Sequence, residues 1–364
     1  MPQFPEGYPR TSALIERLLK LDSSSPESRD AWPVVPPVAL FVSYLRTRDV
    51  SEPDHWTSFW KRHRARQALY RRQLQRVVEE IGLDLPYVVL KGEPLAEDIF
   101  GDGRLRFSSD IDLLIRPKDL DEVLSALQRA GFERQTDKSL DAWGNNQVTA
   151  AHQKWGNNVD VHWALADPWV PAPDTGAFLE CRWEQSVNDG EFSVPVLEPQ
   201  ANFFYLLYNF HHDAGSAKGL LDICGWLDRY GNTHLGEDFP SWIRKSPVYG
   251  VFGWANRTYE RLTGSTLVAD SPDYPPHLKA PIEAFSRRTA HSLDSLMQPN
   301  ETTEQAAWAK PLRTLGGTIE RGLSLTLFEY WCRRPHQLLW PVILGRHRIG
   351  KFVADTLELK SNPR

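Results

Sequence analysis

Residues 87–116, YVVLKGEPLAEDIFGDGRLRFSSDIDLLIR, contain the pattern that decides the fold. Within them, Asp110-Ile111-Asp112 begins an apolar run that predicts a β-strand. Alternate residues of a strand project to the same face, so we expect Asp110 and Asp112 on one face and Ile111 in a core. Two like charges side by side repel each other, and a divalent cation such as Mg²⁺, which prefers carboxylate oxygens, relieves that repulsion. The alternative is a strand end whose aspartates bond to a turn or to an arginine.

The segments on either side of this strand predict a sheet covered by helices. Residues 85–90 form a short run rich in β-branched and aromatic residues, which indicates a buried strand that ends at Lys91-Gly92. Residues 93–100 predict a helix, and residues 118–130 have the apolar spacing of an amphipathic helix. Strands and helices therefore alternate through this part of the chain.

Further strands follow. Residues 132–163 predict antiparallel strands joined by polar turns, and residues 192–197 predict one more strand. Apolar and polar residues alternate at the end of the first of these stretches, so Asp160 and His162 share a face. Strand, helix, strand, helix and then a hairpin indicate a small mixed β-sheet with helices packed on it, an α+β fold.

Helical patterns dominate both ends of the chain. Residues 56–81 predict a long, strongly basic helix whose apolar spacing is interrupted between residues 61 and 67, where a break or kink is one expectation. Its basic run is typical of a solvated helix face, and the alternative is a surface that steers a polyanion. We divide the chain into a helical and loop segment (residues 1–55), an α/β core (56–198) and a mainly helical part that completes the substrate pocket (199–364).

Composition limits the class of protein. The 364 residues are enough for one large or two medium domains, and 42 basic against 47 acidic residues give a net charge of -5. This charge implies no general attraction to nucleic acid or to an anionic membrane. Three widely spaced cysteines without a CxxC pair suit a reducing cytoplasm and argue against a disulfide scaffold or a zinc site. We see no secretory signal, and the longest apolar stretch, residues 34–45, is too short to span a bilayer, so we expect a soluble cytoplasmic protein without a membrane partner.

Several core residues form a pattern typical of chemistry on phosphates. Lys91-Gly92 leads into a helix start, where backbone N–H groups and the helix dipole favour a phosphate. Asp110 and Asp112 on one strand and Asp160 on another supply three carboxylates. Such a cluster suits two divalent metal ions, which activate an attacking hydroxyl and neutralise a leaving pyrophosphate.

These residues resemble the uncharacterised nucleotidyltransferase family of the DNA polymerase β-like superfamily. The resemblance covers about residues 70–230, and weakly the helical remainder. The aspartate pair alone is a weak signal, and the ordered set of motifs is a stronger one. Those motifs are Leu90-Lys91-Gly92, Arg106, Asp110-Ile111-Asp112-Leu113-Leu114, Gly131-Phe132 at the end of a helix, and Val159-Asp160-Val161-His162-Trp163.

The resemblance implies a role for each residue of the site. Asp110 and Asp112 would bind Mg²⁺, or Mn²⁺ in its place, and Asp160 would be the third carboxylate and the general base for the acceptor. The residues expected to bind the nucleotide and its phosphates are Lys91, Gly92, Arg106 and His162. The superfamily usually has a Gly-Ser or Gly-Gly turn before its first aspartate, whereas this chain has Gly92-Glu93, so one phosphate contact lacks its serine.

Structural explanations compete with these roles. Lys91 could be a solvated lysine at a strand end, and Arg106 could pair with Asp110 without any substrate. His162 could be a sheet histidine stacked by Trp163.

Residues of the helical part have similar alternatives. His211-His212-Asp213 end a predicted helix, where histidines favour the dipole. Asp222 lies in an apolar helix, and we expect it to pair with a neighbouring arginine because a lone buried carboxylate is costly.

Three hypotheses for the function follow. The first is an enzyme that transfers a nucleoside monophosphate from an NTP to an unidentified acceptor hydroxyl or phosphate, on a small molecule or a protein. The second is a catalytically silent nucleotide-binding module of a toxin–antitoxin or biosynthetic complex. The third, transfer to RNA, rests on the basic helix over residues 61–76 alone, and the net charge of -5 argues against it.

Overall fold

The structure is a computed structural model. The residues that it describes are 4–19, 38–82, 84–106, 108, 110–135, 146–154, 157–165, 175–187, 190–213, 215–231, 243, 246, 248–268, 274 and 276–294.

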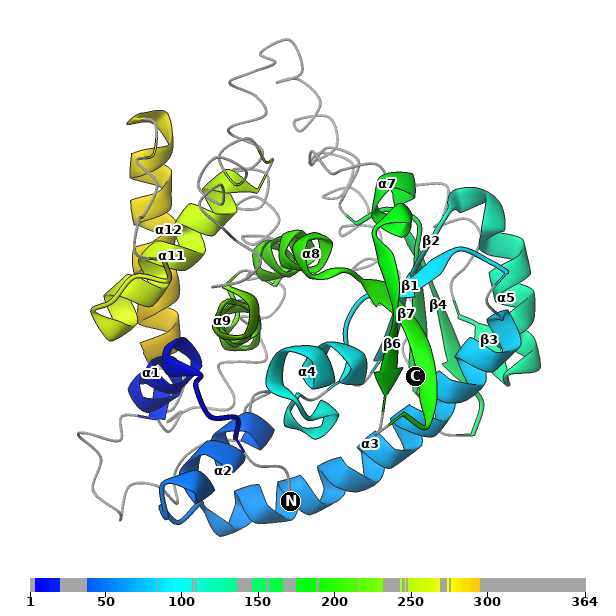
Figure 1. The fold of residues 1–364 in the computed structure, drawn as a ribbon, viewed down its shortest axis with the longest axis horizontal. Helices are drawn as coiled ribbons and strands as arrows, with labels where there is room; N and C mark the ends of the chain where they lie inside the picture. Colours follow the sequence, from blue (N-terminus) through cyan, green and yellow to red (C-terminus); the bar gives the residue numbers. More distant parts are fainter. Residues whose placement is uncertain are drawn as a thin grey trace, which may run out of the picture.

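The described strands form one mixed sheet in the order β3-β4-β5-β2-β1-β7-β6. Figure 1 shows the sheet on one side of the molecule and most of the helices on the other. The strands are β1 (Tyr87–Val89), β2 (Asp110–Ile115), β3 (Phe132–Arg134), β4 (Gln147–His152), β5 (Asn158–His162), β6 (Arg182–Val187) and β7 (Phe192–Leu197).

Strand β2 lies at the centre of the sheet. It pairs antiparallel with β1 and parallel with β5, while β1 pairs parallel with β7. The strands predicted over residues 132–163 are antiparallel to one another, as expected, and the last of them joins β2 in parallel. This crossover brings two acidic strands together at the middle of the sheet.

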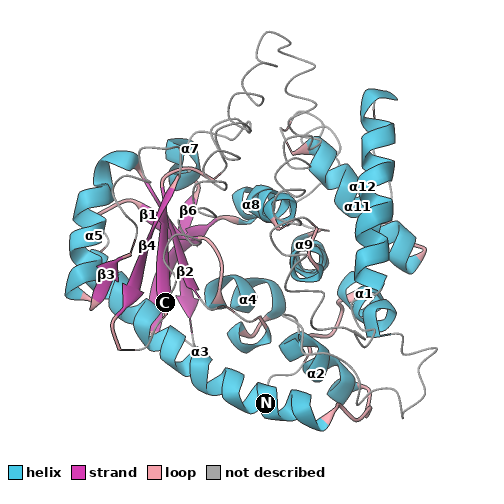
Figure 2. Ribbon diagram, turned by 180° about the vertical axis from the view of Figure 1, so that it is seen from behind, coloured by secondary structure: helices cyan, strands magenta, loops and turns pink. Residues whose placement is uncertain are grey.

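Helices pack on the sheet and beside it (Figure 2). Two short 3₁₀ turns, η2 (Gly103–Leu105) and η3 (Pro117–Asp119), flank β2. The described α-helices are α1 (Pro9–Leu19), α2 (Val38–Thr47), α3 (Asp54–Ile81), α4 (Glu93–Phe100), α5 (Leu120–Arg129), α7 (Thr175–Glu180), α8 (Pro199–His212), α9 (Ala217–Tyr230), α11 (Tyr249–Thr263) and α12 (Pro276–Asp294).

The two faces of β2 meet different partners. Ile111, Leu113 and Ile115 are buried in a core shared with α3 and α5, as the alternation of the sequence predicts. Leu114, on the other face, packs in a cluster with residues of α7 and α8. Asp110 and Asp112 share that second face, so they project toward the helices of the C-terminal part.

The expected break in the basic helix is wrong. Helix α3 is continuous from Asp54 to Ile81, because buried polar side chains occupy the stretch without large apolar residues. His63 and Gln67 take those positions, and Gln67 donates to the backbone oxygen of Gly103 at 3.1 Å. A polar contact with the core thus replaces the missing apolar one.

The helices beside the sheet share one hydrophobic core. It takes residues from α1, α2, α4, α8, α9, α11 and α12. A mixed sheet with packed helices followed by a mainly helical part is therefore confirmed, whereas the three-part division of the chain stays a prediction. Residues 20–37 of the predicted helical and loop segment, and the helices predicted beyond residue 294, lie outside the described residues. None of the described helices is long and apolar enough to cross a membrane.

Candidate functional site

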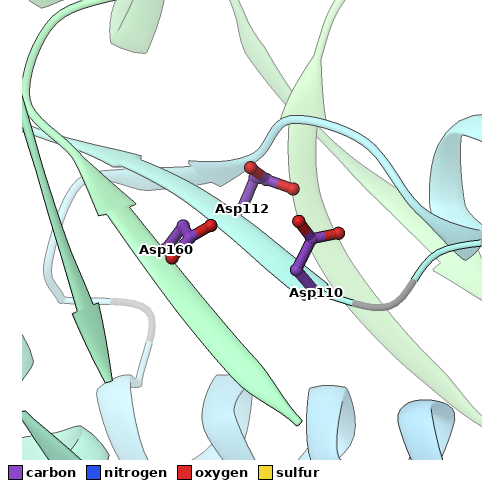
Figure 3. A group of neighbouring side chains, drawn as sticks. All are labelled: Asp110, Asp112 and Asp160. Atoms are coloured by element: carbon purple, nitrogen blue, oxygen red, sulfur yellow. The ribbon is translucent and has the colours of Figure 1, made fainter. Parts of the chain in front are cut away.

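Three carboxylates meet where β2 and β5 lie side by side. The parallel register pairs Asp112 with Asp160, and Asp110 lies two residues before Asp112 on the same face of β2. One carboxylate oxygen from each residue lies within 4.8 Å of the others, the only such group of three metal-ligand residues in the described part of the chain. Figure 3 shows the three side chains on the same side of the two strands.

Asp112 is the buried member of this triad, at 2% exposed. Lys91 Nζ lies 3.0 Å from its Oδ1, and His162 Nε2 lies 3.2 Å from the same oxygen. Burial alone raises the pKa of Asp112, but the hydrogen bond of His162 and the charge of Lys91 outweigh burial and hold the pKa below its usual range. Asp112 is therefore ionised at neutral pH.

Asp160 is only partly buried, and its partner comes from the neighbouring strand. Thr149 lies opposite Asp160 in the antiparallel pair of β4 and β5, and its hydroxyl donates to Oδ1 at 2.6 Å. Burial raises the pKa of Asp160, and the nearby charges of Asp112 and Asp110 raise it further. Together these effects outweigh the hydrogen bond from Thr149, which lowers the pKa, so the pKa of Asp160 lies above its ordinary value.

The triad fits a divalent cation. Oδ2 of Asp112 is buried without a hydrogen-bond partner, although both Lys91 and His162 contact Oδ1. A buried carboxylate oxygen without a partner is costly, and a metal ion bound by the three carboxylates would satisfy it. The donor set of three carboxylates is also the one that Mg²⁺ or Mn²⁺ prefers.

Lys91 is held beside the triad by the sheet. The backbone N–H of Leu90 donates to the carbonyl oxygen of Asp112 at 2.9 Å, which places the next residue, Lys91, next to the Asp112 side chain. Burial lowers the pKa of Lys91, but Tyr205, Asp112 and Asp110 together raise it well above its ordinary value. Lys91 is thus a permanent cation, and the structure does not place it as a solvated lysine.

Gly92 begins α4 in a conformation that favours glycine. Its φ is 92°, and a Cβ at this position would lie 2.1 Å from the Tyr70 hydroxyl oxygen. The next residue, Glu93, is buried and pairs with Arg71, whose Nε lies 2.7 Å from Oε1. Glu93 therefore stabilises the junction of α4 with α3 and does not replace the serine expected in this turn.

A different serine lies beside Gly92. Ser108 Oγ is 3.5 Å from the position that a Cβ of Gly92 would take. The same hydroxyl donates to the Asp110 carbonyl oxygen at 3.0 Å. A hydroxyl is thus present near the turn, supplied from the loop before β2.

Arg106 spans from the sheet to the helical part. Its Nε lies 3.0 Å from both carboxylate oxygens of Asp222 on α9, and both side chains are almost completely buried. The predicted pairing of Asp222 with an arginine is confirmed, and the alternative pairing of Arg106 with Asp110 is not formed. Arg106 Nη1 is buried without a hydrogen-bond partner.

Residues 38–241, more than half of the chain, match the family described as "Uncharacterised nucleotidyltransferase". The chain belongs to the uncharacterised nucleotidyltransferase family. No curated protein and no solved structure matched. Membership and the triad together support nucleotidyl transfer in general, with an NTP as substrate.

In this member of the nucleotidyltransferase family, two residues of the helical part interact electrostatically with the residues around the triad, and the sequence alone did not indicate them. Tyr205 of α8 is buried, and the charges that act on its hydroxyl include those of Lys91, Asp112 and Arg106. Lys218 of α9 faces a similar set of charges. The apolar pattern of α8 indicated only a core for its aromatic residues, and a single lysine near a helix start carries no motif.

The triplet at the end of α8 behaves as predicted for a helix terminus. Helix α8 ends at His212, and Asp213 follows as its C-terminal cap. His212 Nδ1 lies 3.3 Å from Oδ1 of Asp213. Burial raises the pKa of Asp213, but His212, Lys91 and Lys218 lower it more, so the carboxylate faces the cations of the site.

Proposed function

We propose that this nucleotidyltransferase moves a nucleoside monophosphate from an NTP to an acceptor hydroxyl or phosphate and releases pyrophosphate. The observation that carries the proposal is the triad, in which one oxygen each of Asp110, Asp112 and Asp160 lies within 4.8 Å of the others. Lys91, a cation beside the same carboxylates, supplies a contact for phosphate.

The three aspartates would hold Mg²⁺, or Mn²⁺ in its place. When bound, such an ion neutralises charge on the phosphates and lowers the pKa of the attacking hydroxyl. Lys91 and His162 keep Asp112 ionised and fix its orientation through Oδ1, which leaves Oδ2 directed to the ligand.

Asp160 is the residue that we assign to the acceptor. Thr149 occupies its Oδ1, so Oδ2 is the oxygen that receives the acceptor proton. The acceptor oxygen then forms a bond to the α-phosphorus of the NTP. The bond from that phosphorus to the α,β-bridging oxygen breaks, and pyrophosphate leaves with the electron pair.

The triphosphate is expected along the start of α4. The missing Cβ of Gly92 leaves room for the Tyr70 hydroxyl, and its positive φ shapes the turn that leads into the N-terminal backbone N–H groups of α4. Lys91, next to Gly92 in the sequence, and Arg106 supply positive charge to the site, and Ser108 supplies a hydroxyl near the turn. We propose that the helical part completes the pocket and shapes it for the acceptor.

The proposal is tested by an assay of nucleotidyl transfer. The purified chain, Mg²⁺, each of the four NTPs and a cell extract are incubated, and pyrophosphate release and mass increases by AMP, CMP, GMP or UMP are measured on proteins and small molecules. We expect one nucleotide to be transferred, Asp110→Ala to abolish the transfer, and Asp121→Asn, at an exposed acidic position of α5, to leave it unchanged. Transfer by Asp110→Ala at the wild-type rate would contradict the proposal. NTP binding without transfer to any acceptor would favour a silent nucleotide-binding module.

A further inference from the structure

Lys218 lies on α9 next to the site but outside the family motifs. The charges that act on it include those of Arg106, Asp222, Lys91 and Asp110, which belong to the buried ion pair and to the site around the triad. Among the described residues it forms no ion pair and no side-chain hydrogen bond.

The start of α9 holds Lys218 in this place. Ser216 caps the helix, and its hydroxyl accepts the backbone N–H of Gly219 at 3.1 Å. Lys218 and Asp222 are four residues apart, so they share one face of the helix. Because Arg106 binds Asp222, that face is turned toward the loop before β2.

Three basic side chains near the triad differ in whether they form an ion pair. Lys91 is paired with Asp112, and Arg106 is paired with Asp222, whereas Lys218 feels the charges of Asp222, Asp110 and Asp213 without an ion pair to any carboxylate that the structure describes. Burial lowers the pKa of Lys218 to about 8, and the neighbouring Arg106 and Lys91 contribute to the lowering. Arg106 Nη1 is also buried without a partner. A partly buried cation beside two others calls for an anion, because an unpaired charge away from water is costly.

We propose that Lys218 binds the phosphate chain of the NTP, so that the helical part supplies a cation to the donor half of the site. The proposal rests on the proposed function for the identity of the ligand. Lys91 reaches the same phosphates from the sheet, and Lys218 reaches them from α9. Phosphates bound between the two lysines would give Lys218 an ion-pair partner and hold the helical part against the core.

The experiment uses inorganic tripolyphosphate with Mg²⁺ as the probe, so that neither base preference nor the acceptor matters. Its affinity is measured by calorimetry for the full chain and for Lys218→Met, Lys218→Arg and Lys118→Ala, the last at an exposed lysine of η3. We expect Lys218→Met to bind about tenfold to a hundredfold more weakly, the loss for one hydrogen bond to a charged group. Lys218→Arg should retain most of the affinity, and Lys118→Ala should retain all of it.

Each result separates the two proposals. Unchanged affinity in Lys218→Met, at an unchanged melting temperature, overturns the role of Lys218 and leaves nucleotidyl transfer standing. Absence of tripolyphosphate binding in the wild-type chain also overturns it. Binding that depends on Lys218, without transfer of any NMP in the extract assay, supports the role of Lys218 and contradicts the proposed function.

Discussion

Arg106 and Asp222 lie 116 residues apart in the sequence, and Arg106 Nε is 3.0 Å from both carboxylate oxygens of Asp222. The pair is buried between the loop that precedes β2 and the middle of α9. It is therefore a direct polar connection between the sheet and the helical part.

Removing one member of this pair should destabilise the fold strongly. Arg106→Leu or Asp222→Leu leaves a buried charge without its partner, which costs about 3–5 kcal/mol. The double variant should recover much of that loss, because it removes both charges. Urea unfolding of the two single variants and the double variant gives the coupling free energy. Strictly additive effects would show that the pair is not coupled.

We expect substitution of Gly92 to lower the stability of the fold for two separable reasons, backbone strain and a collision with Tyr70. Gly92→Ala places a Cβ at a φ of 92° and 2.1 Å from the Tyr70 hydroxyl oxygen, whereas Gly101→Ala has a φ of 71° and nothing within 4 Å. Strain at positive φ costs about 1–3 kcal/mol, and only Gly92→Ala adds a collision to it. We expect Gly92→Ala to lose more stability than Gly101→Ala in urea unfolding, and Tyr70→Phe in the Gly92→Ala background to recover part of the difference. No recovery of stability when Tyr70→Phe is added to Gly92→Ala would show that Tyr70 moves away freely.

His63 should make the stability of the fold depend on pH. It is 1% exposed on α3, and burial lowers its pKa from 6.5 to about 4. The unfolded chain binds a proton below pH 6.5 that the folded chain does not bind, so stability is complete above pH 6.5 and falls as the pH drops toward about 4. The slope is about 1.4 kcal/mol per pH unit, and the total is at most about 3 kcal/mol.

The comparison for this effect is His63→Phe, which keeps a ring against the aromatic side chain of Phe59. Unfolding free energies measured between pH 4.5 and 7.5 should show a smaller pH slope for His63→Phe than for the wild-type chain. The same slope in both proteins would assign the dependence to other groups.

Lys218 should make phosphate binding weaker as the pH rises, whereas His63 should make the fold more stable as the pH rises. Its pKa is lowered to about 8, so the free site loses this charge as the pH rises through 8. Arginine stays protonated over the same range. The ratio of tripolyphosphate affinities, wild type over Lys218→Arg, should therefore fall between pH 7 and 9, and titration of the phosphate itself cancels in that ratio. A constant ratio would mean that the bound anion does not respond to the charge of Lys218.

Much of the sheet could be predicted from local patterns. The alternation over residues 110–115 predicted correctly which side chains are buried, because period two is a direct consequence of strand geometry. The mostly exposed, polar β6 (Arg182–Val187) was missed because an edge strand needs no apolar alternation. The first helical residues of α2 (Val38–Thr47) follow two prolines, which concealed it in a stretch interpreted only as apolar.

The site was predicted only in part, for a different reason. The strand pattern and the family motifs indicated the three aspartates and Lys91, and the structure brings them together. Tyr205, Lys218 and Ser108 belong to no sequence motif, and their nearness to the site depends on which elements meet in space. In the sequence, Glu93 is notable only because it stands where a serine is expected. In the structure it pairs with Arg71, which lies on another helix. Such relations need tertiary contacts, which local propensity does not contain.

The parallel pairing of β2 with β5 also determines when, during synthesis of the chain, the three aspartates can come together. Asp112 and Asp160 are brought together by a pairing that must wait until α5, β3 and β4, which lie between them in the sequence, have been synthesised. Parallel strands that are far apart in the sequence pair slowly, because the chain loses loop entropy before the contacts between the strands form. A growing chain on the ribosome therefore has no assembled acidic cluster until β5, which ends at His162, has emerged.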